Sequence, residues 1–578
     1  MFEAMISITR RFRFWLIGLT AVILSLVVSP SGWLTLVCSL GSDQAVCAQQ
    51  SPANSEPDCP VPLFSNLGNY HHAIATTSPR AQQYFDQGMT LVYGFNHPEA
   101  IRSFREATRL DPTCTMCYWG LALAWGPHIN AGMSKDGVKE AWQALQTAQS
   151  LSQAAPAAEA AYVQALAARY APNPPKDRRP LDRAYADAMR QVAQQYPDDP
   201  DAATLFAEAL MNGTPWYYWN GDSPKPETVE ILKALESALQ LNANHPGANH
   251  YYIHAVEASP HPEQAVPHAD RLKTLVPGAG HLVHMPSHIQ IQLGQYHAAV
   301  VANQQAIKAD REYVKQCHVQ SQYLTKLYAP HNYHFLWTAA MMGGESQVAL
   351  QAAQQIATDA DRQLSQTTRP GVLYHHAATP LYTLIKFGQW SAIFATPQPD
   401  PQWKYPVGVW HFARGVAFRA TGKPQDALKE LQELRQIAAD RQLKSIMIES
   451  NSAATLLQIA ANVLSGELAA QQGNYAAAVQ DLQAAIALED KLNYVEPQAW
   501  HSPVRQTLGA VLLQAERPVE AEAVYREDLQ RHPENGWSLF GLAASLQAQG
   551  KTEAAQAVQT RFEVAWKHAD VQLTASYL

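Results

Sequence analysis

Charged side chains are scarce in this sequence, and no stretch of it is strongly basic. Charged residues make up 16% of the chain against 47% hydrophobic residues, and the formal net charge is -8. A protein that binds nucleic acid usually carries a basic patch or stripe that meets the phosphates. We therefore expect no nucleic acid among its partners, whereas 578 residues of this composition can bury a large core.

The common catalytic motifs are also missing from the sequence. It contains no HExxH pair, no P-loop lysine motif or other glycine-rich phosphate loop, and no GxSxG elbow. Their absence argues against a nucleotide cofactor and against the hydrolase classes that these motifs mark. The sequence therefore favours a protein that is not an enzyme, and it identifies no catalytic residue.

Cysteine is rare, with six in the whole chain. Cys114 and Cys117 form the motif CTMCYW, in which Tyr118 stands where a c-type haem motif needs histidine. The motif therefore excludes covalent haem, and a lone CxxC is too little for a structural zinc site. A disulfide between Cys114 and Cys117 is the simpler expectation, with redox activity as the alternative.

The first 48 residues differ in character from the rest. Three arginines at positions 10–13 precede the apolar run 14–28, and the small residues Val46 and Ala48 follow. This order is typical of a secretory signal. We predict a signal peptide over 1–48, with an uncleaved membrane anchor as the alternative, and a location outside the cytoplasm, in the periplasm or secreted. Residues 49–75 are expected to form an extended N-terminal segment.

Long β-branched runs are absent, and the remaining chain reads as pairs of alanine-rich helices joined by short turns. Units that start at 81, 246, 280, 330, 408, 459, 502 and 536 share small residues at fixed offsets. An alanine at position 20 lets the two helices of a unit approach closely. That position is held by Ala100, Ala265, Ala299, Ala349, Ala427, Ala478, Ala521 and Ala555, and position 8 is glycine at Gly88, Gly415, Gly466 and Gly509.

These offsets resemble the tetratricopeptide repeat (TPR), a helix–turn–helix unit of about 34 residues. The chain is similar to exported TPR proteins of the bacterial type over most of residues 80–570. The resemblance implies an all-α fold, an α-solenoid of stacked units that form a superhelix with a concave groove. We expect an N-terminal block at 76–394, a proline-rich break at 395–407, and a C-terminal block at 408–578 whose units serve only for packing.

Histidines concentrate in one part of the chain, with 12 of the 22 between residues 245 and 334. His250 and His254 are spaced to lie on one helix face, and His284 and His288 repeat that spacing 34 residues later. Both pairs therefore occupy the same two positions of adjacent units. In TPR proteins this stripe of the first helix faces the concave groove, so the resemblance implies a groove lined by histidines.

An imidazole-rich, carboxylate-poor cluster favours zinc or copper over magnesium or calcium, with iron less favoured. The candidate metal ligands are His250, His254, His281, His284, His288, His331, His334 and Glu257. Glu208 is a further carboxylate that could lie nearby.

Three functions are compatible with this pattern. The first is a protein that binds a transition metal or another ligand in the histidine-lined groove. The second is a scaffold that binds a protein or peptide there without metal, because a single histidine on such a face is commonly just hydrogen-bonded or solvated. The third is a metalloenzyme built in the groove. The aromatic run 216–219 could form one wall of the groove. A membrane is expected as a partner only through the N-terminal segment.

Overall fold

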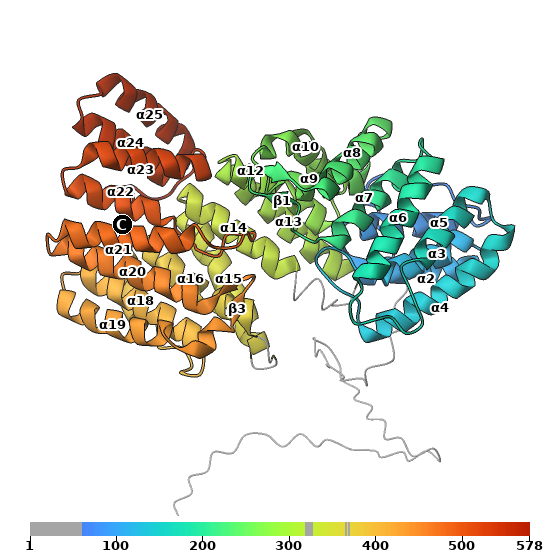
Figure 1. The fold of residues 1–578 in the computed structure, drawn as a ribbon, viewed down its shortest axis with the longest axis horizontal. Coiled ribbons are helices and arrows are strands. Elements are labelled where there is room, and N and C mark those ends of the chain that lie inside the picture. The colour runs from blue at the N-terminus through green and yellow to red at the C-terminus, as the bar shows by residue number, and fades with distance from the viewer. Residues whose placement is uncertain (1–60, 318–327, 365–366, 368–369, 578) are drawn as a thin grey trace, which may run out of the picture. The chain divides into compact units, whose positions relative to one another are not determined.

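The computed structural model describes residues 61–317, 328–364, 367 and 370–577. Nearly all of them belong to helices or to short connections between helices (Figure 1). The predicted signal peptide at 1–48 and the first part of the predicted N-terminal segment lie outside these residues. Residues 61–78 contain no helix or strand, and they contact the first helix through the hydrogen bond of 2.8 Å from the Tyr84 hydroxyl to the Val61 carbonyl.

Before residue 276 the helices pack in consecutive pairs. The pairs are α1 (Pro79–Tyr93) with α2 (His97–Leu110), α3 (Thr115–Ala124) with α4 (Lys135–Leu151), α5 (Ala157–Ala167) with α6 (Arg179–Gln195), α7 (Pro200–Gly213) with α8 (Pro226–Leu241), and α9 (Pro246–Val256) with α10 (Val266–Leu275). Short 3-10 helices follow α4 at Ser152–Ala154 and precede α10 at Pro262–Ala265. The sequence offsets missed α5 to α8, because the loops inside these two helix pairs are longer than those inside the other pairs.

The same pairing continues to the C-terminal end of the described chain. The helices are α11 (Gly280–His284) and α12 (Pro286–Gln292) with α13 (Tyr296–Cys317), α14 (Ala329–Gly343) with α15 (Ser346–Leu364), α16 (Gly371–Lys386) with α17 (Trp390–Ala395), α18 (Lys404–Ala420) with α19 (Pro424–Ala438), α20 (Ala453–Gln471) with α21 (Tyr475–Glu489), α22 (Val504–Gln514) with α23 (Pro518–Arg531), and α24 (Gly536–Ala548) with α25 (Thr552–Ala565). The predicted all-α fold of stacked TPR-type helix pairs is therefore confirmed.

Strand is confined to two small antiparallel hairpins in the described residues. One joins β1 (Trp219–Asn220) to β2 (Ser223–Pro224), and the other joins β3 (Met447–Ile448) to β4 (Asn451–Ser452). A third 3-10 helix, Arg441–Lys444, precedes β3. Both hairpins lie in connections between helices and add nothing to the repeat core.

The glycines at position 8 of two units, Gly88 and Gly509, are explained by the packing within the unit. A Cβ atom on Gly88 would lie 2.6 Å from the ring of Phe104, and one on Gly509 would lie 2.4 Å from the ring of Tyr525. Real Cβ atoms do not approach a ring this closely, so either substitution forces a shift of a buried aromatic side chain. Glycine at this position therefore sets the spacing between the two helices of the unit.

We predict that Gly509→Ala destabilises the C-terminal helix pairs by about 1–3 kcal/mol, the usual cost of overpacking a core. Thermal unfolding followed by circular dichroism would detect the change. The matched control is Gly132→Ala, because a Cβ atom there has no neighbour within 4 Å. Equal unfolding temperatures for the two variants would contradict the packing role of position 8.

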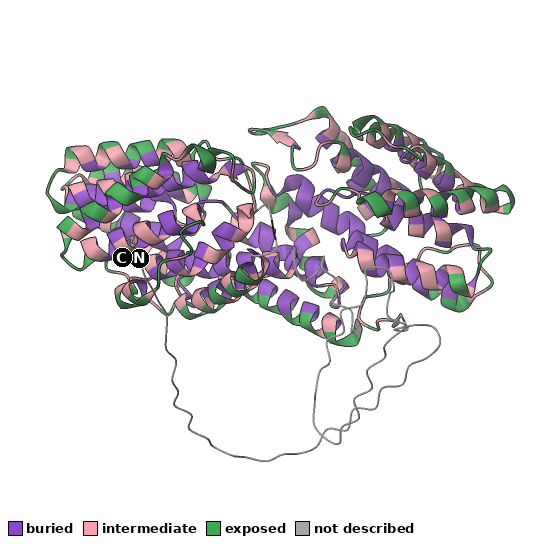
Figure 2. Ribbon diagram, turned by 90° about the horizontal axis from the view of Figure 1, so that it is seen from below, coloured by how far each residue is buried: buried purple, intermediate pink, exposed green. Residues whose placement is uncertain are grey.

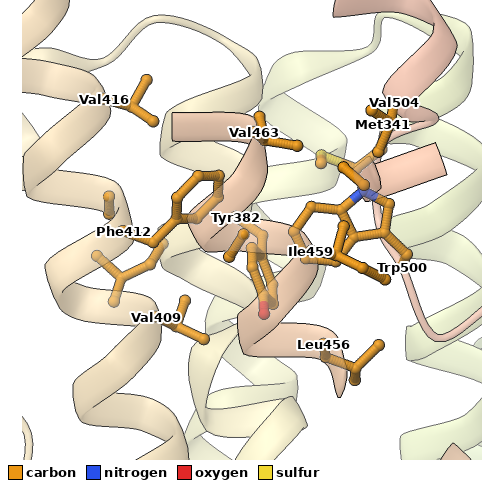
Figure 3. Close-up of a cluster of buried hydrophobic side chains, with 14 of the residues drawn as sticks. Met341, Tyr382, Val409, Phe412, Val416, Leu456, Ile459, Val463, Trp500 and Val504 are labelled. Atoms are coloured by element: carbon orange, nitrogen blue, oxygen red, sulfur yellow. The ribbon is translucent and has the colours of Figure 1, made fainter. Parts of the chain in front are cut away.

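Buried residues lie on the faces where neighbouring helices meet, while exposed residues follow the outer faces (Figure 2). One apolar cluster joins helices on both sides of residues 396–403, since α16 contacts α18. Figure 3 shows part of it, with Tyr382 of α16 near Phe412 of α18 and Trp500. The hydrophobic contacts therefore continue across the proline-rich segment, and the division into two blocks at 395–407 stays a prediction.

Among the described residues, one helix, α20, is long and apolar enough to cross a membrane. Its most apolar window is 72% buried inside the protein. Packing against α18, α19 and α21 accounts for that apolar character.

Candidate metal centre

Six histidine side chains from four helices lie together. They are His250 and His254 of α9, His281 and His284 of α11, His288 of α12, and His331 of α14. Five are buried, with exposed fractions between 0% and 6%, and His331 is partly exposed. The histidine face that we expected to line an open groove is therefore enclosed, because other segments of the chain cover it.

The sequence repeat explains how these side chains meet. α9 and the combined helices α11 and α12 are the first helices of adjacent units, and α9 contacts α12. The break between α11 and α12 falls at Pro286, whose nitrogen has no hydrogen to donate to the preceding turn. Equivalent positions of the two units thus place the pair His250 and His254 next to the pair His284 and His288.

The first group, which we call triad 1, consists of His250, His254 and His281. Each offers a ring nitrogen, and these three atoms lie within 4.8 Å of one another. The Nε2 atoms of His250 and His281 are 3.1 Å apart. Two imidazole nitrogens bound to one zinc ion at about 2.0–2.1 Å in a tetrahedral site lie about 3.3 Å apart, so this spacing suits a shared metal ion.

The second group, triad 2, consists of His284, His288 and His331, whose ring nitrogens also lie within 4.8 Å of one another. The Nε2 atoms of His284 and His288 are 2.7 Å apart. The ring of His331 lies 4.9 Å from that of His284, measured between centroids. Triad 2 adjoins triad 1, since the centroids of His281 and His284 are 5.7 Å apart.

Hydrogen bonds at the Nδ1 atoms fix which nitrogen faces inward. His250 Nδ1 lies 2.6 Å from the backbone carbonyl of Tyr93, and His284 Nδ1 lies 2.7 Å from the side-chain oxygen of Asn303. Because both partners are acceptors, each Nδ1 carries the hydrogen and each Nε2 presents a lone pair. Metal-binding histidines are held in this way, by donating the other ring N–H to an acceptor.

Two glutamates hold the Nδ1 atoms of His254 and His288. Glu257 lies 2.9 Å from His254 Nδ1 and 2.6 Å from His288 Nδ1, one contact through each carboxylate oxygen. Glu496 also forms an ion pair with His288 Nδ1. Glu257 therefore joins one histidine of triad 1 to one of triad 2.

Glu496 contacts the histidine cluster through His288, and the sequence did not indicate it. It lies in the connection between α21 and α22, within the block that we expected to serve only for packing. This connection reaches back across the fold to α12, so the block contributes a side chain to the histidine cluster. Glu496 stands at no repeat position and belongs to no motif, so no sequence signal marks it.

Electrostatics keep most of these imidazoles neutral. Burial holds the pKa values of His250, His254, His281 and His284 well below their usual range, and it lowers the pKa of His331 to about 3. Burial alone would lower the pKa of His288 as well, but Glu496 and Glu257 raise it to about 10. Neutral imidazole is the form that binds metal ions.

Two nitrogens in triad 1 are left without partners. Among the described residues, His254 Nε2 and His281 Nδ1 are buried and have no hydrogen-bond partner. A buried polar atom with no partner costs about 1–3 kcal/mol. Since His254 Nδ1 faces Glu257, its bare Nε2 is the atom that a cation in triad 1 would satisfy.

A phenylalanine packs against each triad. Phe95 lies beside His250 and His281, at centroid distances of 4.6 and 5.4 Å. Phe335 lies beside His284 and His288, at 4.6 and 4.3 Å. Phe95 has a φ of 57° in the turn between α1 and α2, a left-handed conformation that costs a non-glycine residue about 1–3 kcal/mol and is frequent at functional sites.

A small cavity adjoins each triad. One of about 20 Å³ borders His281, and one of about 40 Å³ borders His288. The first is lined in part by Asp310, Tyr313 and Tyr328, and the second by Phe335, Tyr494, Glu496 and Arg531. Each is large enough for a water molecule.

The aromatic run 216–219 lies against α9. The ring of Trp216 meets that of His254 edge-on at 5.1 Å, and the Trp219 indole donates to the Ala255 carbonyl at 2.7 Å. This run therefore covers the C-terminal end of α9, next to triad 1.

Two residues considered from the sequence lie elsewhere. His334 lies on another face of α14, with its ring 5.0 Å from His376 and 5.6 Å from His375. Glu208 contacts Arg169 at 3.5 Å and accepts from Asn212. Among the described residues, neither belongs to a group of candidate metal ligands whose atoms lie within 4.8 Å of one another.

Cys114 and Cys117 are joined by a disulfide at the start of α3. It lies in a separate small apolar cluster with Ala81, Tyr84 and Ala107. The disulfide therefore belongs to the first helix pairs and not to the histidine site.

Comparison with known proteins does not assign this site. No family model and no curated protein matches the chain. Solved structures that resemble it include the human IFIT1 dimer with m7Gppp-AAAA, at 12% identity over 86% of this chain and 92% of that chain with a TM-score of 0.29. The P58(IPK) TPR domain aligns at 11% identity over 82% of this chain and 99% of that chain with a TM-score of 0.23. Likenesses this weak carry no argument about function, and the prediction about nucleic acid stays a prediction.

Proposed function

We propose that this chain is a TPR-type helical-repeat protein that binds transition-metal ions through its buried histidine cluster. The observation that carries the proposal is the orientation of the rings. The Nδ1 atoms of His250 and His284 face acceptors, so their Nε2 atoms carry lone pairs, and each lies close to the Nε2 atom of a second histidine, His281 at 3.1 Å and His288 at 2.7 Å. A cation between such nitrogens, a metal ion or a proton, offsets the cost of burying their lone pairs together.

A proton is the natural competitor of the metal in triad 2. With its raised pKa, His288 carries a second proton in the metal-free protein, and its Nε2–H then donates to His284 Nε2 across 2.7 Å. Binding of a metal ion there releases that proton. The imidazole ligand set favours zinc or copper.

The decisive experiment measures metal in the full chain purified without an affinity tag. Elemental analysis after incubation with Zn²⁺ or Cu²⁺ should find tightly bound metal in the wild type. The double variant His250→Ala/His284→Ala should lose it, because it removes one ligand from each triad. A wild type that retains no more metal than this variant would overturn the proposal.

The matched control is the double variant His71→Ala/His261→Ala. Both side chains are exposed, at 59% and 63%, and each contacts only one carboxylate. This control should bind as much metal as the wild type, which would separate the cluster from adventitious binding by surface histidines.

We predict that removing the metal with a chelator lowers the thermal unfolding temperature. An ion at 100 times its dissociation constant stabilises the folded state by about 2.7 kcal/mol. Four helices contribute ligands, so the loss should be seen by circular dichroism of the helical signal. The double variant His250→Ala/His284→Ala should show no such chelator effect, and an equal effect in both proteins would contradict binding at the cluster.

A metalloenzyme is the second candidate, favoured by the cavities beside His281 and His288. Three imidazoles leave a metal ion with an open position, and each cavity offers room for water there.

Exported localisation follows from the signal-like residues 1–48 and is part of the proposal. Secretion of a fusion of these residues to a reporter would test it.

A further inference from the structure

We propose that the cluster is a two-ion centre, with one metal ion in each triad and Glu257 linking the two. This inference rests on the proposed function and concerns how many ions bind and how they are coupled. It is carried by the spacing of the six imidazoles and by the position of one carboxylate.

The cluster is too extended for a single ion. Ligand atoms on opposite sides of a metal at about 2.0–2.1 Å lie about 4.2 Å apart at most. Among the described residues, two groups made only of imidazoles meet a limit of 4.8 Å: His250, His254 and His281, and His284, His288 and His331. A third group, His254, Glu257 and His288, takes one histidine from each triad and joins them through the carboxylate. No such group contains four of the six histidines, so the arrangement has two foci.

Each focus is complete on its own. Each triad has one close pair of Nε2 atoms, at 3.1 Å in triad 1 and 2.7 Å in triad 2. Each also has its own phenylalanine wall and its own cavity. Three imidazoles with one open position form a recognised coordination set for zinc.

The two foci are also neighbours. Centroid distances of 5.7 Å between His281 and His284 and 5.6 Å between His254 and His288 span the boundary between the triads. Glu257 contacts His254 through one oxygen and His288 through the other. The negative charge of this buried carboxylate therefore offsets part of the repulsion between two nearby cations.

The test is the metal stoichiometry of the full chain and of two matched variants. His250 and His284 hold equivalent positions in adjacent units, each with its Nδ1 on an acceptor, so His250→Ala and His284→Ala are comparable changes. We expect two ions per wild-type chain and one tightly bound ion in each single variant. Circular dichroism would establish that each variant is folded.

The outcomes separate this inference from the proposed function. One ion per wild-type chain, lost from both variants, would overturn the two-ion centre while leaving metal binding intact. No bound ion in the wild type would overturn both. The wild-type stoichiometry decides the matter even where a variant fails to fold.

Electron paramagnetic resonance with Cu²⁺ provides an independent readout. If the ions occupy neighbouring triads, the second equivalent should broaden or quench the signal of the first. Two equivalents that give the spectrum of isolated ions would contradict adjacent sites. In His284→Ala the signal of the single bound ion should remain sharp.

Discussion

Glu257→Gln is expected to weaken metal binding in both triads, by about 10–100-fold in each. One carboxylate oxygen accepts the N–H of His254 at 2.9 Å, and the other forms an ion pair with His288 Nδ1 at 2.6 Å. An amide has only one oxygen, so its NH₂ group would lie against the Nδ1–H of one of the two rings. The substitution also removes the negative charge that orients the rings of His254 and His288 and raises their basicity.

Glu496→Gln is the matched control for this prediction. Glu496 forms an ion pair with His288 of triad 2, whereas Glu257 also holds His254 of triad 1. Glu496→Gln should therefore weaken metal binding in triad 2 and leave the metal affinity of triad 1 unchanged. Competition titrations against a chelating dye, with the two affinities fitted separately, would measure both variants.

Two results would count against the role given to Glu257. If Glu257→Gln changed only one affinity, the carboxylate would not link the triads. If it changed neither, its contacts with His254 and His288 would serve packing alone. Loss of helical signal in the variant would be recognised by circular dichroism before any titration.

The fold was predictable because the same helix-packing positions recur in successive repeat units. Alanine recurs at position 20 and glycine at position 8 of four units, and Gly88 and Gly509 show the close helix contact that favours glycine there. The histidine pairs were found by the same logic, since His250 and His284 are one repeat apart. A periodic signal predicts what is periodic in the structure.

The rest of the site depends on contacts that have no period. Glu496 comes from a connection more than 200 residues beyond His288 in sequence, as its separation of 208 shows. Asn303 holds His284 from the second helix of its unit, and Phe95 reaches triad 1 from a turn. None of these residues occupies a position that the repeat defines for ligand contact.

His334 illustrates the opposite error. It was among the candidate ligands, yet its ring lies beside those of His375 and His376 and it belongs to neither triad. The unit that begins with α14 follows the long helix α13, so its rotation relative to α11 is not set by the regular spacing. His331, one turn earlier, is the residue of α14 that reaches the cluster.

Asp201→Asn is expected to destabilise the N-terminal helix pairs by about 3–5 kcal/mol, the usual cost of leaving buried partners without their charge. The Asp201 carboxylate is buried and accepts from Tyr70 at 2.7 Å and Tyr93 at 2.5 Å. It also contacts His72 at 2.9 Å and His245 at 3.0 Å. An amide cannot accept from all four, because its nitrogen side is a donor.

Asp199→Asn is the matched control, two residues away. Asp199 caps α7 and accepts from the Tyr162 hydroxyl, and asparagine is an equally good N-cap. Its loss of stability should therefore be much smaller. Urea unfolding in the presence of a chelator would compare the two variants without a contribution from bound metal.

The pH dependence gives a sharper test of the same network. Burial alone would raise the pKa of Asp201, but His245 and His72 hold it well below its usual range. Burial alone would lower the pKa of His72, but the hydrogen bond and charge of Asp201, with Asp199 and Asp86 nearby, raise it to about 9. The shift of the His72 pKa limits the stabilisation at high pH, and the shift of the Asp201 pKa limits it at low pH.

The stabilisation from His72 is fully present below its unfolded pKa of about 6.5 and is lost as the pH rises through about 9. That from Asp201 is present above its unfolded pKa of about 3.9 and is lost as the pH falls below it. The difference in unfolding free energy between wild type and Asp201→Asn should therefore be largest between about pH 4 and 6.5 and should shrink on both sides. A difference that stays constant from acid to alkaline pH would show that Asp201 stabilises the fold without its charge.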